Sequence, residues 1–421
     1  MSYLPSKVRC RRLCLSLRAD TSAYIFDKTA TVLVILFLLA SWLLVLVVQL
    51  FCLLFLFSRL AFRPVSAPKG ATVAPVMGVT VVVCAHNEHD NLLELLPLLT
   101  AQNYPLYEVL VMDDRSTDLS DVLLEEMVHL LPNLRYIRID VEADHVTPKK
   151  YALTIALKKA MYPTVLLTDA DCRPASDAWL TGMVEPLQQP GTEIVLGVSP
   201  YERKPGFLNF LIRSETLFTA VQYLSLALAK RPYMGVGRNL LYRREVFFRH
   251  KGFYSHMRVW GGDDDLFVNE AATPHNVAVA LHADTFTTSA PKETWADWQR
   301  QKQRHLAVGK RYKTGDKVRL GIITASHVLT WVLGLGVGLY VLWLAMSGQK
   351  TALLNPLLLG ATGLFVLRFG LFWGIVGRIS NKLGKQIAPF AIPLTDLILA
   401  IYYCFSTLRV ALTWRRKQGG W

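Results

Sequence analysis

An uninterrupted apolar segment near the start of the chain places the strongest constraint on its fold. Residues 30–57 contain no charged side chain, and Gln49 is the one amide among them. At about 1.5 Å per residue, a helix over this segment would be about 40 Å long, more than the roughly 30 Å hydrocarbon core of a bilayer. The segment is too long for a signal-peptide core and is not followed by a small-residue cleavage pattern. We therefore predict a tilted, uncleaved transmembrane helix.

Three further apolar segments follow late in the chain, at residues 320–346, 353–376 and 387–408. The composition agrees with a membrane protein, because 52% of the residues are hydrophobic and only 19% are charged, whereas soluble domains have about a quarter charged residues. We predict a multi-pass protein with four spans, a basic N-terminal tail over residues 1–29 and a C-terminal tail over residues 409–421.

The net charge of the chain is strongly positive, at 46 − 32 = +14, which favours contact with anionic lipids or phosphorylated substrates. The basic residues gather at the membrane edges, as in the juxtamembrane segment 307–319, and this distribution argues against a nucleic-acid partner. By the positive-inside rule, that segment and the domain before it lie in the cytoplasm. Four spans would place both termini outside, although both tails are basic, so the span count is uncertain by one. We expect a bacterial inner-membrane location.

Residues 75–306 switch to alternating strand and helix patterns, with predicted strands at 78–85, 107–114, 134–140 and 164–171. This alternation is typical of an α/β domain with a mostly parallel sheet. Ligands of such sheets bind at the carboxyl ends of the strands. Neither the dinucleotide fingerprint G-x-G-x-x-G nor the phosphate-binding G-x-x-x-x-G-K-[ST] follows a predicted strand, which disfavours a dinucleotide oxidoreductase and a P-loop ATPase.

Acidic side chains gather where the predicted strands end. The clusters are MDDRSTD, which starts at residue 112, TDADC, which starts at residue 168, and the aspartates of WGGDDDL at residues 263–265. Asp169 and Asp171 are two residues apart after a buried strand, so both can face the same divalent ion, and an all-oxygen site suits Mg²⁺ or Mn²⁺. Each cluster by itself is also compatible with helix capping.

These motifs together resemble those of the membrane-integrated family-2 glycosyltransferases, an inverting group that includes cellulose, hyaluronan and chitin synthases and lipid glycosyltransferases. The similar elements, in chain order, are VVVCAHNEHDNL, MDDRSTD, PKKYAL, TDADC, WGGDDD and QKQRH. The resemblance covers nearly the whole chain. It implies a GT-A nucleotide-sugar-binding, Rossmann-like domain inserted between transmembrane helices.

The resemblance also implies roles for individual residues. Nucleotide-sugar binding is assigned to Asn87, Glu88, Asp113, Asp114, Lys149, Asp169, Gln301 and Arg304, and the metal to Asp171 with Asp169. Lys149 is placed near the diphosphate, although Pro148 stands where the family has glycine and Lys150 is an alternative. Asp264 is expected to be the catalytic base, with Asp263 its neighbour.

Two positions are assigned to the acceptor. Asn239 lies in GVGRNLLY, which resembles an acceptor-lining loop and equally fits a glycine-rich turn. His305 replaces the tryptophan that is expected to stack on the acceptor sugar in polymer-forming members, and this departure weakens a polymerase assignment.

We therefore predict a metal-dependent, inverting hexosyltransferase that moves a sugar from a nucleotide-sugar, with UDP-sugars favoured, to a lipid or membrane-associated glycan acceptor. The alternatives are a processive polysaccharide synthase and a non-catalytic subunit of a polysaccharide or secretion complex.

Overall fold

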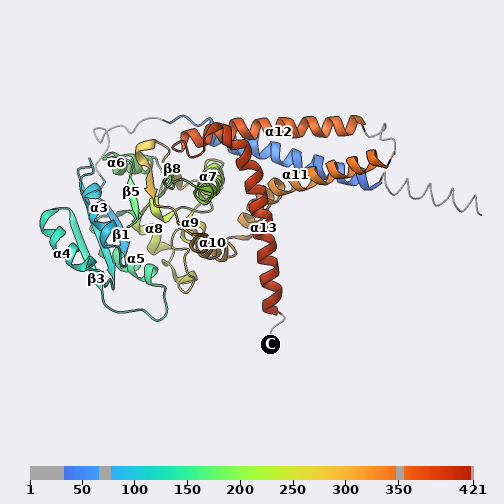
Figure 1. Ribbon diagram of the computed structural model, residues 1–421. Coiled ribbons are helices and arrows are strands. Elements are labelled where there is room, and N and C mark those ends of the chain that lie inside the picture. The colour runs from blue at the N-terminus through green and yellow to red at the C-terminus, as the bar shows by residue number, and fades with distance from the viewer. Residues whose placement is uncertain (1–32, 66–76, 348–354, 419–421) are drawn as a thin grey trace, which may run out of the picture. The chain divides into compact units, whose positions relative to one another are not determined.

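The computed structural model describes residues 33–65, 77–347 and 355–418, with side chains described as far as Ser406 (Figure 1). The predicted N-terminal tail 1–29 and the end of the predicted C-terminal tail 409–421, residues 419–421, lie outside these ranges. So do the starts of the first span and of the α/β domain, at residues 30–32 and 75–76. The chain divides into two compact units. Met1–Phe51, Ile323–Gly370 and Tyr403–Trp421 form the helical unit, and Cys52–Ile322 with Leu371–Tyr402 form the α/β unit.

The α/β unit contains a seven-stranded sheet in the order β3-β2-β1-β4-β7-β6-β8. The first four strands in chain order pair in parallel, as predicted, whereas β7 runs antiparallel to both β4 and β6. A second, two-stranded sheet pairs β5 with β9. The strands are β1 (Val79–Ala85), β2 (Tyr107–Asp114), β3 (Leu134–Ile139), β4 (Thr164–Asp169), β5 (Cys172–Pro174), β6 (Ile194–Leu196), β7 (Leu240–Arg243), β8 (Val277–Val279) and β9 (Thr287–Ser289).

Continuous apolar strands explain why the sheet is covered on both faces. Val79, Val81 and Val83 of β1 belong to a core that also contains leucines of the amphipathic helix α3 (His89–Thr100). Val82, which points to the other face by the period of two, is also buried, and α5 (Pro148–Lys159) contacts β1 and β2. Because both faces are dry, the sites open to ligands lie at the strand ends.

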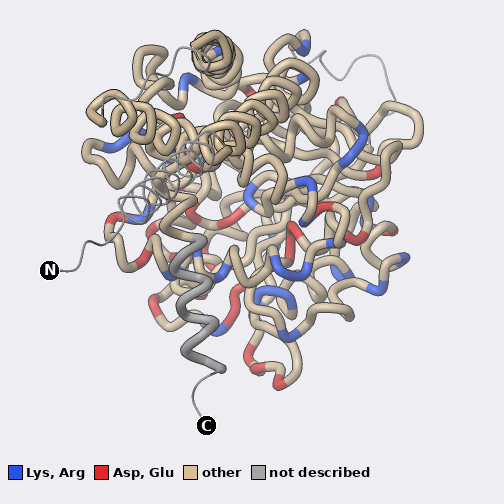
Figure 2. Tube along the Cα trace, turned by 90° about the vertical axis from the view of Figure 1, so that its right-hand side faces the viewer, with Lys and Arg blue, Asp and Glu red and all other residues tan. Residues whose placement is uncertain are grey.

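The remaining helices of the α/β unit follow the sheet strands or pack beside them. They are α4 (Ser120–Leu130), α6 (Trp179–Val184), α7 (Phe207–Leu228), α8 (Arg244–Arg249), α9 (Asp265–Ala271) and α10 (Trp295–Gly309), with short 3-10 turns at Glu185–Gln188, Gly237–Asn239, Tyr254–His256, Ala283–Thr285 and Pro389–Ala391. Most residues of α7 are buried, so this helix is part of the core. Basic and acidic residues are interspersed along much of the chain (Figure 2).

Among the described residues, four helices are long and apolar enough to cross a membrane: Leu33–Ala61, α11 (Thr314–Met346), α12 (Asn355–Lys382) and Pro389–Ser406, which includes the first part of α13 (Ile392–Gln418). The first of these includes one π-helical stretch, Cys52–Phe57, and ends with α2 (Ser58–Ala61). These segments correspond to the four predicted ones, with ends shifted by several residues.

The helical unit is held together by polar as well as apolar contacts. Trp42 Nε1 donates to the carbonyl of Thr330 over 2.9 Å, and Gln49 Nε2 donates to Ser326 Oγ over 2.7 Å. Arg368 Nη2 donates to Gln49 Oε1 over 3.0 Å and lies 3.2 Å from His327 Nδ1. The isolated amide noted in the first apolar segment therefore binds polar groups of α11 and α12, in keeping with the high cost of unpaired polar groups in lipid.

A lysine of α12 binds the end of the first long helix inside the α/β unit. Lys382 Nζ donates to the carbonyls of Leu60 over 2.8 Å, Ala61 over 3.0 Å and Arg63 over 2.6 Å. Arg378 Nε also donates to the carbonyl of Ala61, over 3.1 Å. The last carbonyls of a helix have no partner within it, and here two cations from a distant part of the sequence satisfy them.

Candidate active site

A lysine joins two of the three acidic clusters at the carboxyl ends of the strands. Lys149 Nζ lies 2.7 Å from Asp169 Oδ1, at the end of β4, and 3.2 Å from Asp263 Oδ2, just before α9. Burial lowers the pKa of Lys149, but the two carboxylates outweigh it and raise that pKa well above the usual value. The Lys149 ammonium is therefore a permanent positive charge between the two clusters.

The adjacent lysine has a different environment. Lys150 is fully buried and its Nζ donates to the carbonyls of His256 and Val259 over 2.7 and 2.8 Å. Burial lowers its pKa to about 8. Of the two lysines left open by the sequence, Lys149 faces the carboxylates and Lys150 anchors the segment before Asp263.

The two candidate catalytic aspartates differ in what they contact. Asp264 Oδ2 accepts from Gly237 N over 2.6 Å and its Oδ1 accepts from Asp265 N over 2.7 Å, which makes it the N-cap of α9. Burial and the charge of Asp263 raise the pKa of Asp264. Burial also raises the pKa of Asp263, but Lys149 outweighs it and keeps that pKa below the usual value. Asp263 thus faces the other charged groups, whereas Asp264 fixes the loop at Gly237.

The second metal candidate of the Asp-x-Asp pair lies against the small sheet. Asp171 Oδ2 accepts from Ser289 Oγ over 3.3 Å, and Cys172 Sγ lies 3.6 Å from Asp171 Oδ1. Among the described residues, Asp169 and Asp171 each have at least one carboxylate oxygen that forms no ion pair. In the part of the chain that the structure describes, no three His, Cys, Asp or Glu side chains converge as a ready-made metal cage. The pair therefore fits Mg²⁺ or Mn²⁺ with remaining positions open to phosphate and water oxygens.

The loops after β1 and β2 are tied to each other. Asn87 has a positive φ of 56°, its N–H donates to Ser116 Oγ over 2.9 Å, and its Oδ1 accepts from Thr117 N over 2.8 Å. Glu88 is half-buried, which raises its pKa, and it accepts from Asn91 Nδ2 over 2.6 Å. The predicted nucleotide-edge residues Asn87 and Glu88 thus lie beside the Asp-Asp motif.

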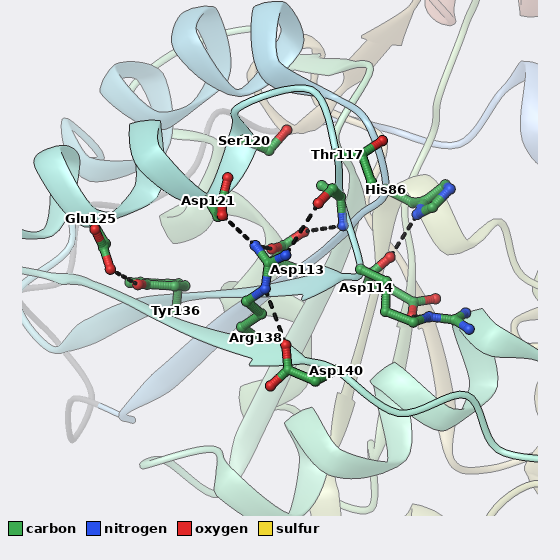
Figure 3. Close-up of polar contacts among 12 residues, drawn as sticks. His86, Asp113, Asp114, Thr117, Ser120, Asp121, Glu125, Tyr136, Arg138 and Asp140 are labelled. Atoms are coloured by element: carbon green, nitrogen blue, oxygen red, sulfur yellow. Dashed lines mark hydrogen bonds and ion pairs between the residues drawn. The ribbon is translucent and has the colours of Figure 1, made fainter.

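Asp113, which we predict to bind the nucleotide-sugar, is held by the turn after β2 and by a cation of β3. It is fully buried, and its carboxylate accepts from Ser116 N over 3.2 Å and pairs with Arg138 over 3.2 Å. Figure 3 shows Arg138 between Asp113, Asp121 and Asp140. The structure therefore uses Asp113 to hold the turn after β2.

Asp114 ends β2 next to this network. Its Oδ1 pairs with Arg115 Nε over 2.9 Å, and its carbonyl lies 2.6 Å from His86 Nδ1 (Figure 3). The two adjacent carboxylates thus have different partners: Asp114 is bound by Arg115, in the loop after β2, and Asp113 by Arg138.

The helix α10 carries the predicted Gln301, Arg304 and His305. Its N-cap is Thr294, whose hydroxyl accepts from Asp297 N over 3.2 Å. Gln301 Nε2 donates to Tyr201 OH over 3.1 Å, and His305 is exposed. Arg304 and Gln301 line a cavity of about 560 Å³ whose charged members are Lys204, Lys292, Glu293, Asp297, Arg300 and Arg304. The excess of cations over carboxylates suits an anionic ligand.

Sequence reasoning missed Arg238. Its guanidinium lies 4.3 Å from the ring centre of Tyr201, and its Nη2 donates to the carbonyl of Ser199 over 3.2 Å. Burial lowers its pKa, but Tyr201, Cys172, Asp169 and Asp171 outweigh it and raise that pKa. Its Nη1 is buried and has no hydrogen-bond partner among the described residues. The sequence feature that points to Arg238 is its position directly before Asn239 in GVGRNLLY.

Asn239, which we predict at the acceptor, has a side chain that binds groups of the core. Its side chain is fully buried, its Oδ1 accepts from Trp179 Nε1 over 3.1 Å, and its Nδ2 donates to the carbonyls of Val198 and Thr285 over 2.9 and 2.7 Å. Both N–H groups of the amide and one lone pair of its oxygen are therefore occupied within the core.

We expect Asn239→Ala to unfold at a lower temperature than the wild type. The substitution leaves Trp179 Nε1 and the Thr285 carbonyl unpaired, at a cost of about 1–3 kcal/mol each before relaxation, whereas the Val198 carbonyl still accepts from Thr287 N. Thermal unfolding of the detergent-solubilised protein measures the change. An unchanged unfolding temperature with a large rise in acceptor KM would instead return Asn239 to the acceptor site.

Comparison with known proteins shows what this domain is similar to. Residues 80–249 match the family model of glycosyl transferase family 2. No curated protein matches the chain. A mannosyltransferase from Pyrobaculum calidifontis, PcManGT in complex with GDP-Man and Mn²⁺, is 19% identical with a TM-score of 0.53, covering 87% of this chain and 99% of that one.

Two further solved structures are less similar. Residues 1–349 of S. aureus TarS are 14% identical with a TM-score of 0.40, covering 79% of this chain and 92% of that one. Mannosyl-3-phosphoglycerate synthase from Rubrobacter xylanophilus is 19% identical with a TM-score of 0.38, covering 56% and 74%. The likeness to PcManGT, with a TM-score of 0.53, shows that the seven-stranded mixed sheet has a GT-A-type fold. The chain also has helices that are apolar enough to span a membrane.

Proposed function

We propose that the protein is a membrane-bound, inverting glycosyltransferase that moves a sugar from a nucleotide-sugar to a lipid or membrane-associated acceptor. The observation that supports it best is the Lys149 bridge, which brings Asp169 and Asp263 from separate motifs to one site. Transfer requires charge neutralisation of the leaving diphosphate and a base for the acceptor hydroxyl. The strand-end groups include candidates for both tasks.

We assign the base to Asp263 rather than to Asp264, the residue favoured by the motif. Both oxygens of Asp264 already accept backbone N–H groups, from Gly237 and Asp265. Asp263 is bound by Lys149, which the donor diphosphate would attract, and losing that cation would raise the pKa of Asp263. Donor binding would therefore activate the base, which takes the proton of the acceptor hydroxyl as it attacks the sugar from the face opposite the leaving group.

The cations around the Asp-x-Asp pair would bind the diphosphate. Lys149 pairs with Asp169, and the charges of Asp169 and Asp171 help to raise the pKa of Arg238. Arg304 and Gln301 of α10 line the cation-rich cavity. Asn87, Glu88 and Asp114 would hold the nucleoside end. Asp171 and Asp169 would hold Mg²⁺ or Mn²⁺, which supplies positive charge to the leaving group.

Removal of the metal gives a direct test of this assignment. We expect chelation by EDTA to abolish transfer, and Mn²⁺ or Mg²⁺ to restore it, because the pair offers only oxygen ligands. Asp171→Asn should raise the Mn²⁺ concentration required for half-maximal transfer. Full activity in EDTA would show that Lys149, Arg238 and Arg304 neutralise the diphosphate without a metal.

The function itself is tested with purified protein, Mn²⁺ and a panel of UDP- and GDP-sugars, with membrane lipid added back. Label that partitions into organic solvent identifies a lipid acceptor, and label in high-molecular-weight material identifies a polysaccharide synthase. Absence of nucleotide release with every donor would contradict the proposal and favour a non-catalytic subunit.

A further inference from the structure

The first part of the last helix, up to Tyr402, belongs to the α/β unit. The ring centres of Tyr402 on α13 and Trp298 on α10 lie 5.2 Å apart. Ile398 and Tyr402 pack on a buried cluster that contains Trp298 and two α7 residues, Leu211 and Ile212. Within this unit, α13 therefore packs on α7 and on α10, the helix that carries Gln301 and Arg304.

The surroundings of Trp298 are incompatible with the interior of a bilayer. Its neighbours on α10 include Asp297, Arg300 and Gln301, and Lys302 pairs with Glu215 of α7. Charged groups at hydrocarbon depth are costly and rare. Trp298 thus lies outside the hydrocarbon, and so does Tyr402, which touches it.

The segment that precedes α13 is also bound to the α/β unit. Arg213 of α7 donates to the carbonyl of Gln386. Residues 386 and 402 therefore both lie at this unit, and only residues 403–418 of the helix remain to cross a membrane. Sixteen residues make a helix of about 24 Å, short of the roughly 30 Å hydrocarbon core, and they include Arg409, Arg415, Arg416 and Lys417.

The outer side of α13 is apolar nonetheless. Leu394, Ile401 and Phe405 are 52%, 47% and 68% exposed, and their spacing of seven and four residues places them along one side of the helix. The residues between them on that side, Leu397 and Cys404, are also apolar. An apolar side next to a basic segment is typical of a helix that lies in the membrane interface.

We propose that α13 does not cross the bilayer but lies along its surface, with Leu394, Ile401 and Phe405 in the boundary between headgroups and acyl chains. Its partner is a bilayer that contains anionic lipid, which the basic residues after position 408 would attract. The chain then crosses the membrane three times, and its C-terminal segment lies on the same side as the α/β unit. This arrangement removes the conflict between a fourth span and the basic C-terminal tail.

Sidedness tests the proposal without any need for enzymatic activity. Protease-cleavable tags are placed after Trp421, in the exposed stretch around Val141, and between Met346 and Asn355. In sealed membrane vesicles, we expect the tags at 421 and 141 to be cut from the same face and the tag between α11 and α12 from the other. Cleavage of the 421 and 141 tags from opposite faces would overturn the proposal.

Depth of insertion tests the lipid partner. In proteoliposomes with anionic lipid, a fluorophore on Ile401→Cys, with the native cysteines replaced, should be quenched more by a nitroxide near the headgroup than by one deep in the acyl chain. The matched control, Leu335→Cys in the middle of α11, should show the opposite order. Stronger deep quenching at position 401 would indicate a span, and no quenching by either label would indicate a protein partner; both results contradict the proposal.

Discussion

Replacing Asp263 with asparagine is expected to lower sugar transfer by about 10²–10⁴-fold, the usual contribution of a positioned general base. Donor affinity should change little, because the introduced amide keeps an oxygen near Lys149 and the nucleotide-binding groups are untouched. Titration calorimetry with the nucleotide diphosphate and Mn²⁺, beside single-turnover transfer, separates the two effects.

The adjacent substitution Asp264→Asn is the matched control. Its amide nitrogen cannot accept a hydrogen bond, so either Gly237 N or Asp265 N loses its partner. We expect the free energy of unfolding to fall by about 1–3 kcal/mol, which lowers the unfolding temperature. Transfer should fall less than in Asp263→Asn. The reverse order of activities, with an unchanged unfolding temperature for Asp264→Asn, would restore Asp264 as the base.

The two neighbouring lysines should give the second large contrast. Lys149→Met removes the cation that faces Asp169 and Asp263. We expect the affinity for the diphosphate and the rate of transfer each to fall by about 10²-fold, because a hydrogen bond to a charged group is worth about 1.5–3 kcal/mol. The unfolding temperature should fall less than in Lys150→Met, because the Lys149 and Asp169 side chains are 42% and 32% exposed, although the buried Asp263 loses its cation.

Lys150→Met should behave in the opposite way. The buried carbonyls of His256 and Val259 lose a charged donor, so we expect a loss of about 2–4 kcal/mol of stability. Diphosphate affinity of the folded protein should stay within a few-fold of the wild type. Equal effects of the two substitutions on affinity would show that the segment before Asp263 moves when its anchor is lost, and would weaken the separation of roles.

Much of the α/β domain could be predicted because its strands are short, apolar and evenly separated by amphipathic helices. The predicted strand at 107–114 is β2, and the predicted strand at 164–171 contains β4, which ends at Asp169. The antiparallel β7 and the second sheet were missed, because strands of three or four residues leave no periodic pattern long enough to read. Strand order likewise depends on contacts between distant segments.

The sequence predicts which segments carry the polar residues of the candidate site, but it does not distinguish between adjacent residues within a segment. Asp113 and Asp114 are adjacent and chemically identical, yet only the structure shows that Arg138 and Ser116 occupy Asp113. The same holds for the adjacent residues Asn239 and Arg238. The Asn239 amide binds core carbonyls, whereas the charges of Asp169 and Asp171 act on the Arg238 guanidinium. Sequence spacing cannot reveal which member of such a pair finds its hydrogen-bond partners in the core.

The lysine that binds the end of the first long helix imposes an order on biosynthesis. The carbonyl of Leu60 and the ammonium of Lys382 are 322 residues apart in the chain. At a synthesis rate of about 5–20 residues per second, the first helix waits roughly 15–60 s for the group that completes its end. During that interval its last carbonyls must be hydrated by water or lipid headgroups. The anchor can therefore close only after the whole α/β domain has left the ribosome.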